Sequence, residues 1–339
     1  MIPLLTLASA FGLVSSVALV ALTRRWARRR QLLDHPNERS LHHRPTPRGG
    51  GIGIVLPTVT AIIVAAASLE GAGTWSLWLA GLALSLAIVG FLDDLRNLSA
   101  TVRLVIQIAV AAAFVWAVSP WNVVHIPGAV PLDLGFAAAA FTVVFLVWIS
   151  NAYNFMDGID GLAGVQGLIA GFGWVLVGYQ LNDPLIVVGG AAVLFACLGF
   201  LFFNWPPASI FMGDVGTGFL GFLFGGLTVY ASTRSPAAAA AGVAFVWPFL
   251  FDTLFTIARR ATRGENLLRA HRSHLYQRLV LTGCSHRAVT LLYGGLAASG
   301  AVIGAASLGT NAWSGLWYAL PLLAGAIWLL VLIRERSAR

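Results

Sequence analysis

Apolar runs long enough to cross a lipid bilayer recur from one end of this chain to the other. A helix needs about 20 mainly apolar residues to span the hydrocarbon core. The runs are continuously apolar and lack the strict alternation of a transmembrane β-strand. The pattern therefore predicts an all-α, polytopic membrane helix bundle that forms one domain over residues 1–339. The roughly eleven predicted spans are residues 2–22, 50–69, 75–92, 101–118, 136–150, 162–180, 184–203, 215–231, 237–257, 288–308 and 314–333.

Charged residues are scarce, and the basic ones are all of one type. Only 10% of the residues are charged, where a soluble domain carries roughly 25%. The net charge of +8 comes entirely from Arg, because the chain contains no Lys. A high pI often indicates nucleic-acid binding. Here the membrane explains the charge better, so we expect no nucleic-acid partner.

The Arg residues also predict the orientation of the chain. Eleven spans would place the two termini on opposite sides of the membrane. The loops that begin at residues 23, 93, 151, 204 and 258 then share a side with the C-terminal tail, and that side holds every Arg except Arg234. The positive-inside rule makes this side cytoplasmic. We therefore expect a multi-pass inner (plasma) membrane protein with its N-terminus outside and its C-terminus inside.

Two acidic motifs follow predicted spans on the cytoplasmic side. Asp93 and Asp94 end the third span, where the repulsion between adjacent carboxylates could prepare one of them as a base, or the pair could hold a cation. The simpler alternative is a solvated helix end. Asp157 and Asp160 would share a face on a helical turn, and Asn154 adds an amide on the same side. Acids at a membrane boundary without Arg among them indicate a ligand site.

A third motif runs from Asn204 to Gly218, where paired prolines stop the seventh span. Asp214 then lies at the start of the eighth span, between glycines. It is either the N-cap of that helix or a ligand of Mg²⁺, which favours one or two carboxylates together with substrate phosphates. The sequence leaves both readings open.

Two basic segments complete the predicted site. Arg48 precedes a Gly-rich stretch that opens the second span, a combination that suits an anion. In the loop from Arg259 to Arg287, most Arg residues need no explanation beyond the positive-inside rule. The exceptions are residues whose side chains can donate to phosphate oxygens, namely His271, Arg272, His274 and Arg278. No further His or Cys lies at the spacing of a zinc site.

Together these motifs predict phosphoryl transfer between a water-soluble and a lipidic substrate. Acids that hold a divalent cation and basic groups that hold phosphates are the parts that this chemistry needs. The alternative is a transporter or flippase for a lipid-linked or nucleotide sugar. Such a protein would place ionisable residues in mid-helix along a pathway. Here they gather at one membrane surface, which favours an enzyme.

The ordered motifs at residues 45–50, 90–94, 151–162 and 211–214 resemble those of the polyprenyl-phosphate N-acetylhexosamine-1-phosphate transferases, or glycosyltransferase family 4. That family includes phospho-MurNAc-pentapeptide translocase and the GlcNAc-1-phosphate transferases that start O-antigen and other surface polysaccharides. The resemblance implies transfer of a phospho-N-acetylhexosamine from a UDP-sugar to undecaprenyl phosphate, with release of UMP. It implies UDP-N-acetylhexosamine, polyprenyl phosphate and membrane lipid as partners, and leaves a homodimer as one alternative for assembly.

The resemblance also implies a role for each motif. Asp93 or Asp94 would deprotonate the lipid phosphate, which attacks directly or after an aspartyl intermediate. Asp214 would hold Mg²⁺, or Mn²⁺ in its place. The substrate-binding residues would be Arg48, Asn154, Asp157, Asp160, Asn204, Phe211, His271, Arg272, His274 and Arg278. Because this chain lacks the three consecutive His of the pentapeptide enzymes, we expect UDP-GlcNAc or a 6-deoxy relative as the donor.

Overall fold

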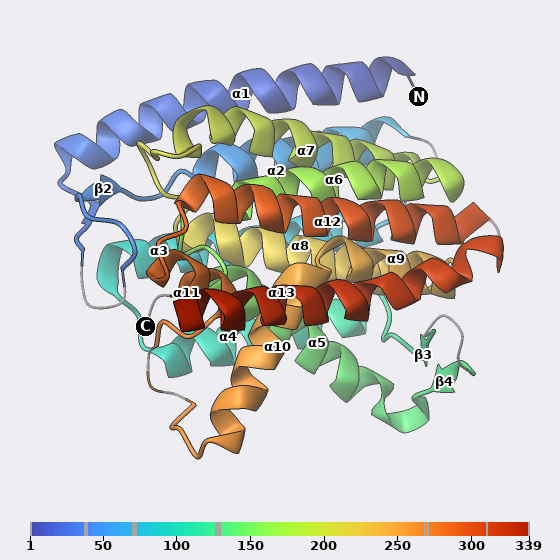
Figure 1. Ribbon diagram of the computed structural model, residues 1–339. Coiled ribbons are helices and arrows are strands. Elements are labelled where there is room, and N and C mark those ends of the chain that lie inside the picture. Colours follow the sequence, from blue (N-terminus) through green and yellow to red (C-terminus); the bar gives the residue numbers. More distant parts are fainter. Residues whose placement is uncertain are drawn as a thin grey trace.

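The computed structural model describes residues 2–36, 40–69, 73–125, 130–267, 269, 271–309 and 311–337. Most of them lie in helices that run along one common axis (Figure 1). The α-helices are α1 (Ile2–Arg29), α2 (Ile52–Ser68), α3 (Trp75–Arg96), α4 (Ala100–Ala117), α5 (Ala138–Phe155), α6 (Leu162–Gln180), α7 (Pro184–Asn204), α8 (Asp214–Ser232), α9 (Pro236–Phe245), α10 (Trp247–Thr262), α11 (Leu275–Leu281), α12 (His286–Gly309) and α13 (Ala319–Ser337).

The remaining regular elements are short and lie at the two ends of the bundle (Figure 1). Two 3₁₀ helices are η1 (Gly135–Ala137) and η2 (Asn311–Tyr318). The antiparallel strands β1 (Leu33–Asp34) and β2 (Thr46–Pro47) form one hairpin, and β3 (Val123–Val124) and β4 (Leu132–Asp133) form another. The β1–β2 hairpin, α11 and the C-terminus share one end of the bundle, whereas the N-terminus and the β3–β4 hairpin lie at the other.

The prediction of an all-α, polytopic membrane bundle is confirmed. Among the described residues, nine helices are long and apolar enough to cross a membrane, and the bent pair α9–α10 would make a tenth. Helix α2 matches the second predicted span but has only 17 residues. The total of eleven spans and the orientation of the termini stay predictions.

The ninth predicted span, 237–257, is wrong as a straight helix. α9 ends at Phe245, α10 begins at Trp247, and the two axes differ by 71°. Pro248 lies in the first turn of α10, which is where proline fits a helix, because it has no N–H to donate to the preceding turn. The break lets α10 leave the bundle axis (Figure 1).

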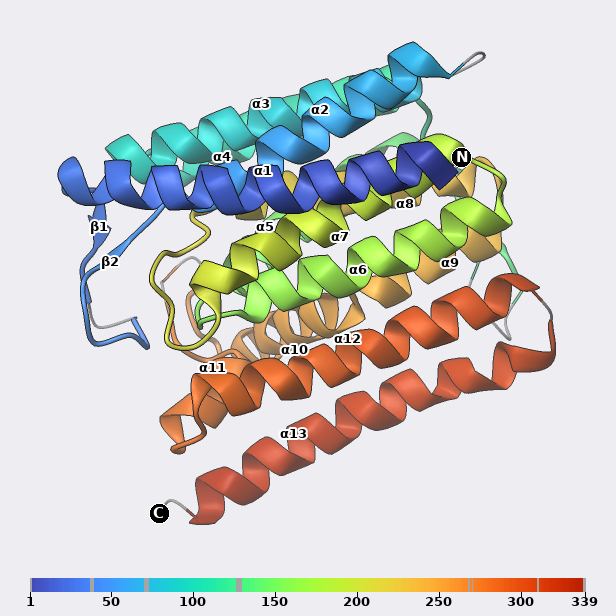
Figure 2. The same cartoon turned by 90° about the horizontal axis from the view of Figure 1, so that it is seen from above.

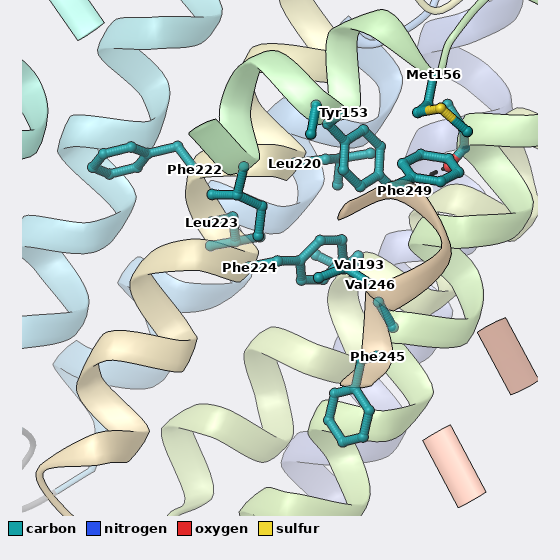
Figure 3. Packing of buried hydrophobic residues seen from close by; sticks show 14 of the residues in the cluster. Tyr153, Met156, Val193, Leu220, Phe222, Leu223, Phe224, Phe245, Val246 and Phe249 are labelled. Carbon is teal, nitrogen blue, oxygen red and sulfur yellow. Dashed lines mark hydrogen bonds between the residues drawn. The ribbon is translucent and has the colours of Figure 1, made fainter. Parts of the chain in front are cut away.

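Helices α7 and α8 form the centre of the bundle, between α1–α4 on one side and α12 and α13 on the other (Figure 2). Glycines allow α6 and α7 to approach closely, because a Cβ on Gly171 would come within 2.8 Å of the Leu194 backbone nitrogen. Tyr153 of α5 is fully buried between Phe224 of α8 and Phe249 of α10, at ring distances of 6.0 and 5.0 Å (Figure 3). This packing fixes the end of α5 and the start of α10 against the middle of α8.

The end of the bundle that carries α11 and the C-terminus should face the cytoplasm. We expect a cysteine introduced at Ser337, on an otherwise cysteine-free background, to resist a membrane-impermeant maleimide in sealed cells and to react after permeabilisation. A cysteine at Asp133, on the exposed β4 strand at the opposite end, is the matched control and should react in sealed cells. Labelling of the Ser337 variant from outside would contradict the predicted orientation.

Candidate active site

A polar recess opens at the end of the bundle where α3 and α5 end and α8 and α12 begin. Its walls hold seven of the predicted site residues, which come from sequence motifs far apart in the chain. The lining residues are Asp34, Ser40, Leu41, His42, Arg48, Asp94, Asn154, Asp157, Gly158, Ile159, Asp160, Phe211, Gly213, Asp214 and His286.

The N-terminus of α8 is capped by a carboxylate from another helix. Asp94, at the end of α3, accepts hydrogen bonds from the backbone N–H groups of Asp214 at 3.2 Å and Val215 at 3.4 Å. Gly90, one turn earlier in α3, has no room for a Cβ against the backbone of Asp214, so the two helices meet there without an intervening side chain. The sequence left open whether Asp214 caps this helix. In the structure the side chain of Asp94 does so.

The Asp214 side chain lies between a cation and an amide. Arg103, near the start of α4, donates to Asp214 Oδ2 at 2.9 Å and to Asp93 Oδ2 at 2.6 Å. Asn154 Nδ2 donates to Asp214 Oδ1 at 2.7 Å. Sequence reasoning missed Arg103, because it counted this residue only as part of the positive-inside pattern. The signal that could have identified Arg103 as a site residue was its position, one turn inside an otherwise apolar span.

The adjacent residues Asp93 and Asp94 have different surroundings. Asp94 lines the recess. The Asp93 carboxylate instead accepts from the backbone N–H of Leu98 at 2.6 Å and from Arg103, and it does not line the recess. Of the two predicted catalytic acids, only Asp94 is therefore placed to meet a ligand there directly.

The expected helical turn at Asp157 and Asp160 is wrong, although both residues line the recess. α5 ends at Phe155, and Gly161, with φ of 79°, is the N-cap residue just before α6, so the two acids lie in a turn between helices. Asp160 Oδ2 accepts from the backbone N–H of Ala208 at 3.0 Å. The positive φ explains why glycine stands at position 161.

Asn204 shapes the recess from behind. This buried residue accepts from the Gly161 N–H at 2.9 Å and donates to the Ile210 carbonyl oxygen at 2.9 Å. It joins the 157–161 turn to the loop between α7 and α8, and it does not line the recess. In this structure Asn204 positions the backbone on both sides of it, and the predicted substrate contact of Asn204 stays a prediction.

The carboxyl groups of Asp157 and Asp160 differ in their affinity for a proton. Burial, followed by the charges of Asp214 and Asp94, raises the pKa of Asp157 well above its usual range. Burial acts on Asp160 in the same direction, but the hydrogen bonds from His286 and Ala208 outweigh it and lower that pKa. Divergent pKa values in neighbouring carboxyls are typical of functional sites.

These opposite shifts predict opposite effects on stability. A folded-state pKa above the unfolded value means that stability falls as pH rises through it. Asp157→Asn should therefore raise Tm relative to the native protein, with an advantage that grows between pH 5 and pH 8.5 to about 2–4 °C. Asp160→Asn is the matched control and should lower Tm at neutral pH. A pH-independent difference for Asp157→Asn in thermal unfolding would contradict this reasoning.

The sequence suggested that the backbone of the Gly-rich stretch after Arg48 binds an anion. In the structure, two of its N–H groups are already used by other backbone atoms. The N–H groups of Gly50 and Gly51 donate to the carbonyl oxygens of Phe211 and Met212 at 2.9 and 2.8 Å. These glycines permit close contact between backbones. The cationic group at this wall is the Arg48 side chain, which pairs with Asp34 and lies 3.9 Å from Asp94 Oδ1. Its binding of an anion stays a prediction.

The predicted binding residues of the basic loop lie outside the recess. His274 Nδ1 is 3.1 Å from Oδ1 of Asp252 in α10, a fully buried acid that also accepts from the Leu275 and Tyr276 N–H groups. Asp252 therefore fastens the start of α11 to α10.

The other basic-loop residues are also held apart from the recess. Arg278 forms a two-pronged ion pair with Glu335 of α13, at 2.7 and 2.6 Å, and Arg272 is exposed. Burial and the charge of His274 lower the pKa of His271 to about 4. α11 contacts the end of α5 through Tyr276, whose hydroxyl donates to the Phe155 carbonyl oxygen at 2.9 Å.

Known proteins are similar in sequence to this chain. The sequence model of the family described as Glycosyl transferase family 4 matches residues 75–232. A probable undecaprenyl-phosphate N-acetylglucosaminyl 1-phosphate transferase of Bacillus subtilis is 30% identical over 284 residues, which cover 83% of this chain and 78% of the relative. The chain belongs to glycosyl transferase family 4.

Two further relatives carry different substrate names. A decaprenyl-phosphate N-acetylglucosaminephosphotransferase of Mycolicibacterium smegmatis is 32% identical over 294 residues, covering 76% of this chain and 71% of the relative. A phospho-N-acetylmuramoyl-pentapeptide-transferase of Geobacillus kaustophilus is 33% identical over 250 residues, covering 69% and 76%. The family 4 match includes the acidic motifs of α3, α5 and α8 and stops before the basic loop.

Asp214, the residue predicted to hold a divalent cation, lines this family 4 recess. Within the described ranges, no three His, Cys, Asp or Glu side chains form a group that could hold a metal ion. Mg²⁺ needs only one or two protein carboxylates when water and substrate phosphates supply the other oxygens. Asp214, with Asp94 bonded to its backbone N–H, meets that requirement, and the metal stays a prediction.

Proposed function

We propose that this family 4 protein transfers a phospho-N-acetylhexosamine from a UDP-sugar to a polyprenyl phosphate. An oxygen of the lipid phosphate would bond to the phosphorus that bears the sugar, the bond from that phosphorus to the UMP oxygen would break, and UMP would leave. The observation that carries the proposal is the recess itself, where Asp94, Asp214 and Arg48 converge at the end of a membrane bundle. The names of the relatives support the same reaction.

The residues of the recess suggest how such a reaction is assisted. A Mg²⁺ ion held at Asp214 would neutralise charge on the diphosphate. Arg48 in the recess, and Arg103 in the smaller cavity beside it that Asn154 and Asp214 also line, can bind phosphate oxygens. Both already lie against carboxylates that a phosphate could replace. Asp94 is the acid that can take the proton of the lipid phosphate, and Asp93 orients Arg103.

We further propose UDP-GlcNAc or a 6-deoxy relative as the donor, undecaprenyl phosphate as the acceptor, and the start of a cell-surface polysaccharide as the biological role. The site would face the cytoplasm, where nucleotide sugars are made. The basic loop supports this choice of sugar, because it reads His271-Arg272-Ser273-His274 and lacks a run of three His.

The purified protein should be tested with undecaprenyl phosphate, Mg²⁺ and a panel of UDP-N-acetylhexosamines that includes UDP-MurNAc-pentapeptide. We expect mass spectrometry to find a lipid-diphospho-GlcNAc, or its 6-deoxy relative, together with an equal amount of UMP. Efficient turnover of the pentapeptide donor would refute the sugar assignment. Movement of an unchanged UDP-sugar or lipid across liposomes, without UMP release, would instead support a transporter or flippase.

A further inference from the structure

The smaller cavity beside the recess has polar walls that the acidic motifs do not explain. It shares Asn154 and Asp214 with the recess, and α4 and α5 add the side chains of Arg103, Gln107 and Asn151. Positions 103 and 107 are one turn apart, so the two α4 side chains lie on the same face of that helix. The cavity is therefore a polar space between helices that adjoins the Asp214 carboxylate.

The orientation of the Gln107 amide follows from its hydrogen bonds. One atom of the Asn151 amide meets the backbone carbonyl oxygen of Val147 at 2.8 Å and an atom of the Gln107 amide at 2.7 Å. A carbonyl oxygen only accepts, so the Asn151 atom is the nitrogen Nδ2. That nitrogen only donates, so the Gln107 atom beside it is the oxygen Oε1. The nitrogen Nε2 is therefore the other end of the Gln107 amide.

Gln107 Nε2 carries two donors, and neither is used by a residue that the structure describes. A donor without a partner inside a membrane span costs free energy, so polar side chains there usually have a function. Arg103 adds a guanidinium to the same cavity. Two groups that donate hydrogen bonds, one of them positively charged, favour an anionic oxygen as their ligand.

The surroundings of α4 indicate which anion this is. The buried residues of α4 all lie in its second half. Around Gln107 the helix instead exposes apolar side chains, namely those of Leu104, Val105 and Ile108. Exposed apolar side chains of a span face lipid. A lipid phosphate can therefore approach Gln107 from beside α4, whereas a nucleotide sugar reaches the recess from water at the end of the bundle.

Arg103 links this cavity to the proposed reaction, because it donates to Asp214 Oδ2 at 2.9 Å. A phosphate held by Arg103 and Gln107 would thus lie beside the carboxylate proposed to hold Mg²⁺. We propose that Gln107 Nε2 donates a hydrogen bond to a phosphate oxygen of the polyprenyl phosphate, and that Asn151 holds the Gln107 amide in the orientation this requires. The assignment rests on the proposed function, because it assumes that acceptor.

Binding of undecaprenyl phosphate, measured without any nucleotide sugar, tests this assignment. Gln107→Leu has no donor and should weaken binding by at least about tenfold, which corresponds to one hydrogen bond to a charged group. Undecaprenol has the same chain without the phosphate, and should bind the native protein and Gln107→Leu alike. In turnover, KM for undecaprenyl phosphate should rise by the same factor while KM for the UDP-sugar stays native.

Gln107→Glu separates the donor from the shape of the side chain. A glutamate oxygen can still accept from Asn151, but an oxygen that repels phosphate replaces Nε2. This variant should therefore bind undecaprenyl phosphate at least as weakly as Gln107→Leu, and both should bind UMP with native affinity. Gln180→Leu is the matched control, because Gln180 is an exposed glutamine at the far end of α6. It should leave every affinity native.

Native affinity of Gln107→Leu for undecaprenyl phosphate would overturn the proposal. An equal loss of affinity for undecaprenol would overturn it too, since the phosphate would not be what Gln107 recognises. So would a rise in KM for the UDP-sugar or a loss of UMP affinity, because the cavity would then serve the nucleotide. A native protein that binds undecaprenyl phosphate but forms no lipid product would refute the proposed function, while the binding comparison would still decide the role of Gln107.

Discussion

Asp214→Asn should lower kcat by about 10²–10³-fold, the usual cost of removing one electrostatic stabiliser from an active site. The change keeps the shape of the side chain and a hydrogen-bond acceptor at the start of α8, so it should leave folding intact. It removes the charge that would hold Mg²⁺ and leaves Arg103 paired with Asp93 alone. Activity should be measured as UMP release over a range of Mg²⁺ concentrations.

The control for this experiment is Asp133→Asn, the same chemical change on the exposed β4 strand at the other end of the bundle. It should show native kcat and native dependence on Mg²⁺. Activity of Asp214→Asn that is close to native and survives EDTA would show that neither the metal nor this carboxylate is needed. The metal assignment would then have to be abandoned.

Asp94→Asn and Asp93→Asn should both lose activity, with different dependence on pH. A phosphate monoester loses its second proton near pH 6, so the reactive dianion rises from about one tenth of the lipid at pH 5 to nearly all of it at pH 8. If Asp94 takes that proton, Asp94→Asn should lose about 100-fold near pH 6, where half of the lipid phosphate still carries the proton. Its rate relative to the native enzyme should then recover as the pH rises to 8, where little of that proton remains to be removed.

Asp93→Asn should lose activity by a similar factor at every pH, because Asp93 acts through Arg103 and does not line the recess. Initial rates between pH 5 and pH 8, with Tm measured alongside, separate the two behaviours. Asn at position 94 can still accept the N–H groups of α8, so the helix cap should survive. If Asp93→Asn, and not Asp94→Asn, recovers activity as the pH rises, the roles of the two acids are reversed. If both variants keep native rates, neither carboxylate takes part in the reaction and the pair only ends the helix.

Several parts of the site were foreseeable from residue type and spacing. Six of the predicted residues converge on one recess, namely Asp94, Asn154, Asp157, Asp160, Phe211 and Asp214. This was expected, because the acidic motifs repeatedly lie at the ends of spans on the same side of the membrane. Other predicted site residues lie outside it, because an acidic side chain holds them elsewhere. His274 is held by Asp252 and Arg278 by Glu335, and neither partner is adjacent in sequence.

The sequence by itself determined that this chain is a polytopic helical membrane protein, because a backbone in lipid must satisfy its own hydrogen bonds and long apolar runs can do so as helices. It also determined which end of the bundle carries the polar chemistry. Only the tertiary structure decided that Asp94 and not Asp93 faces the recess, since adjacent side chains project about 100° apart on a helix. Packing against other helices selects between them. Arg103 and His286 likewise became site residues only when α4 and α12 packed against α8 and the 157–161 turn.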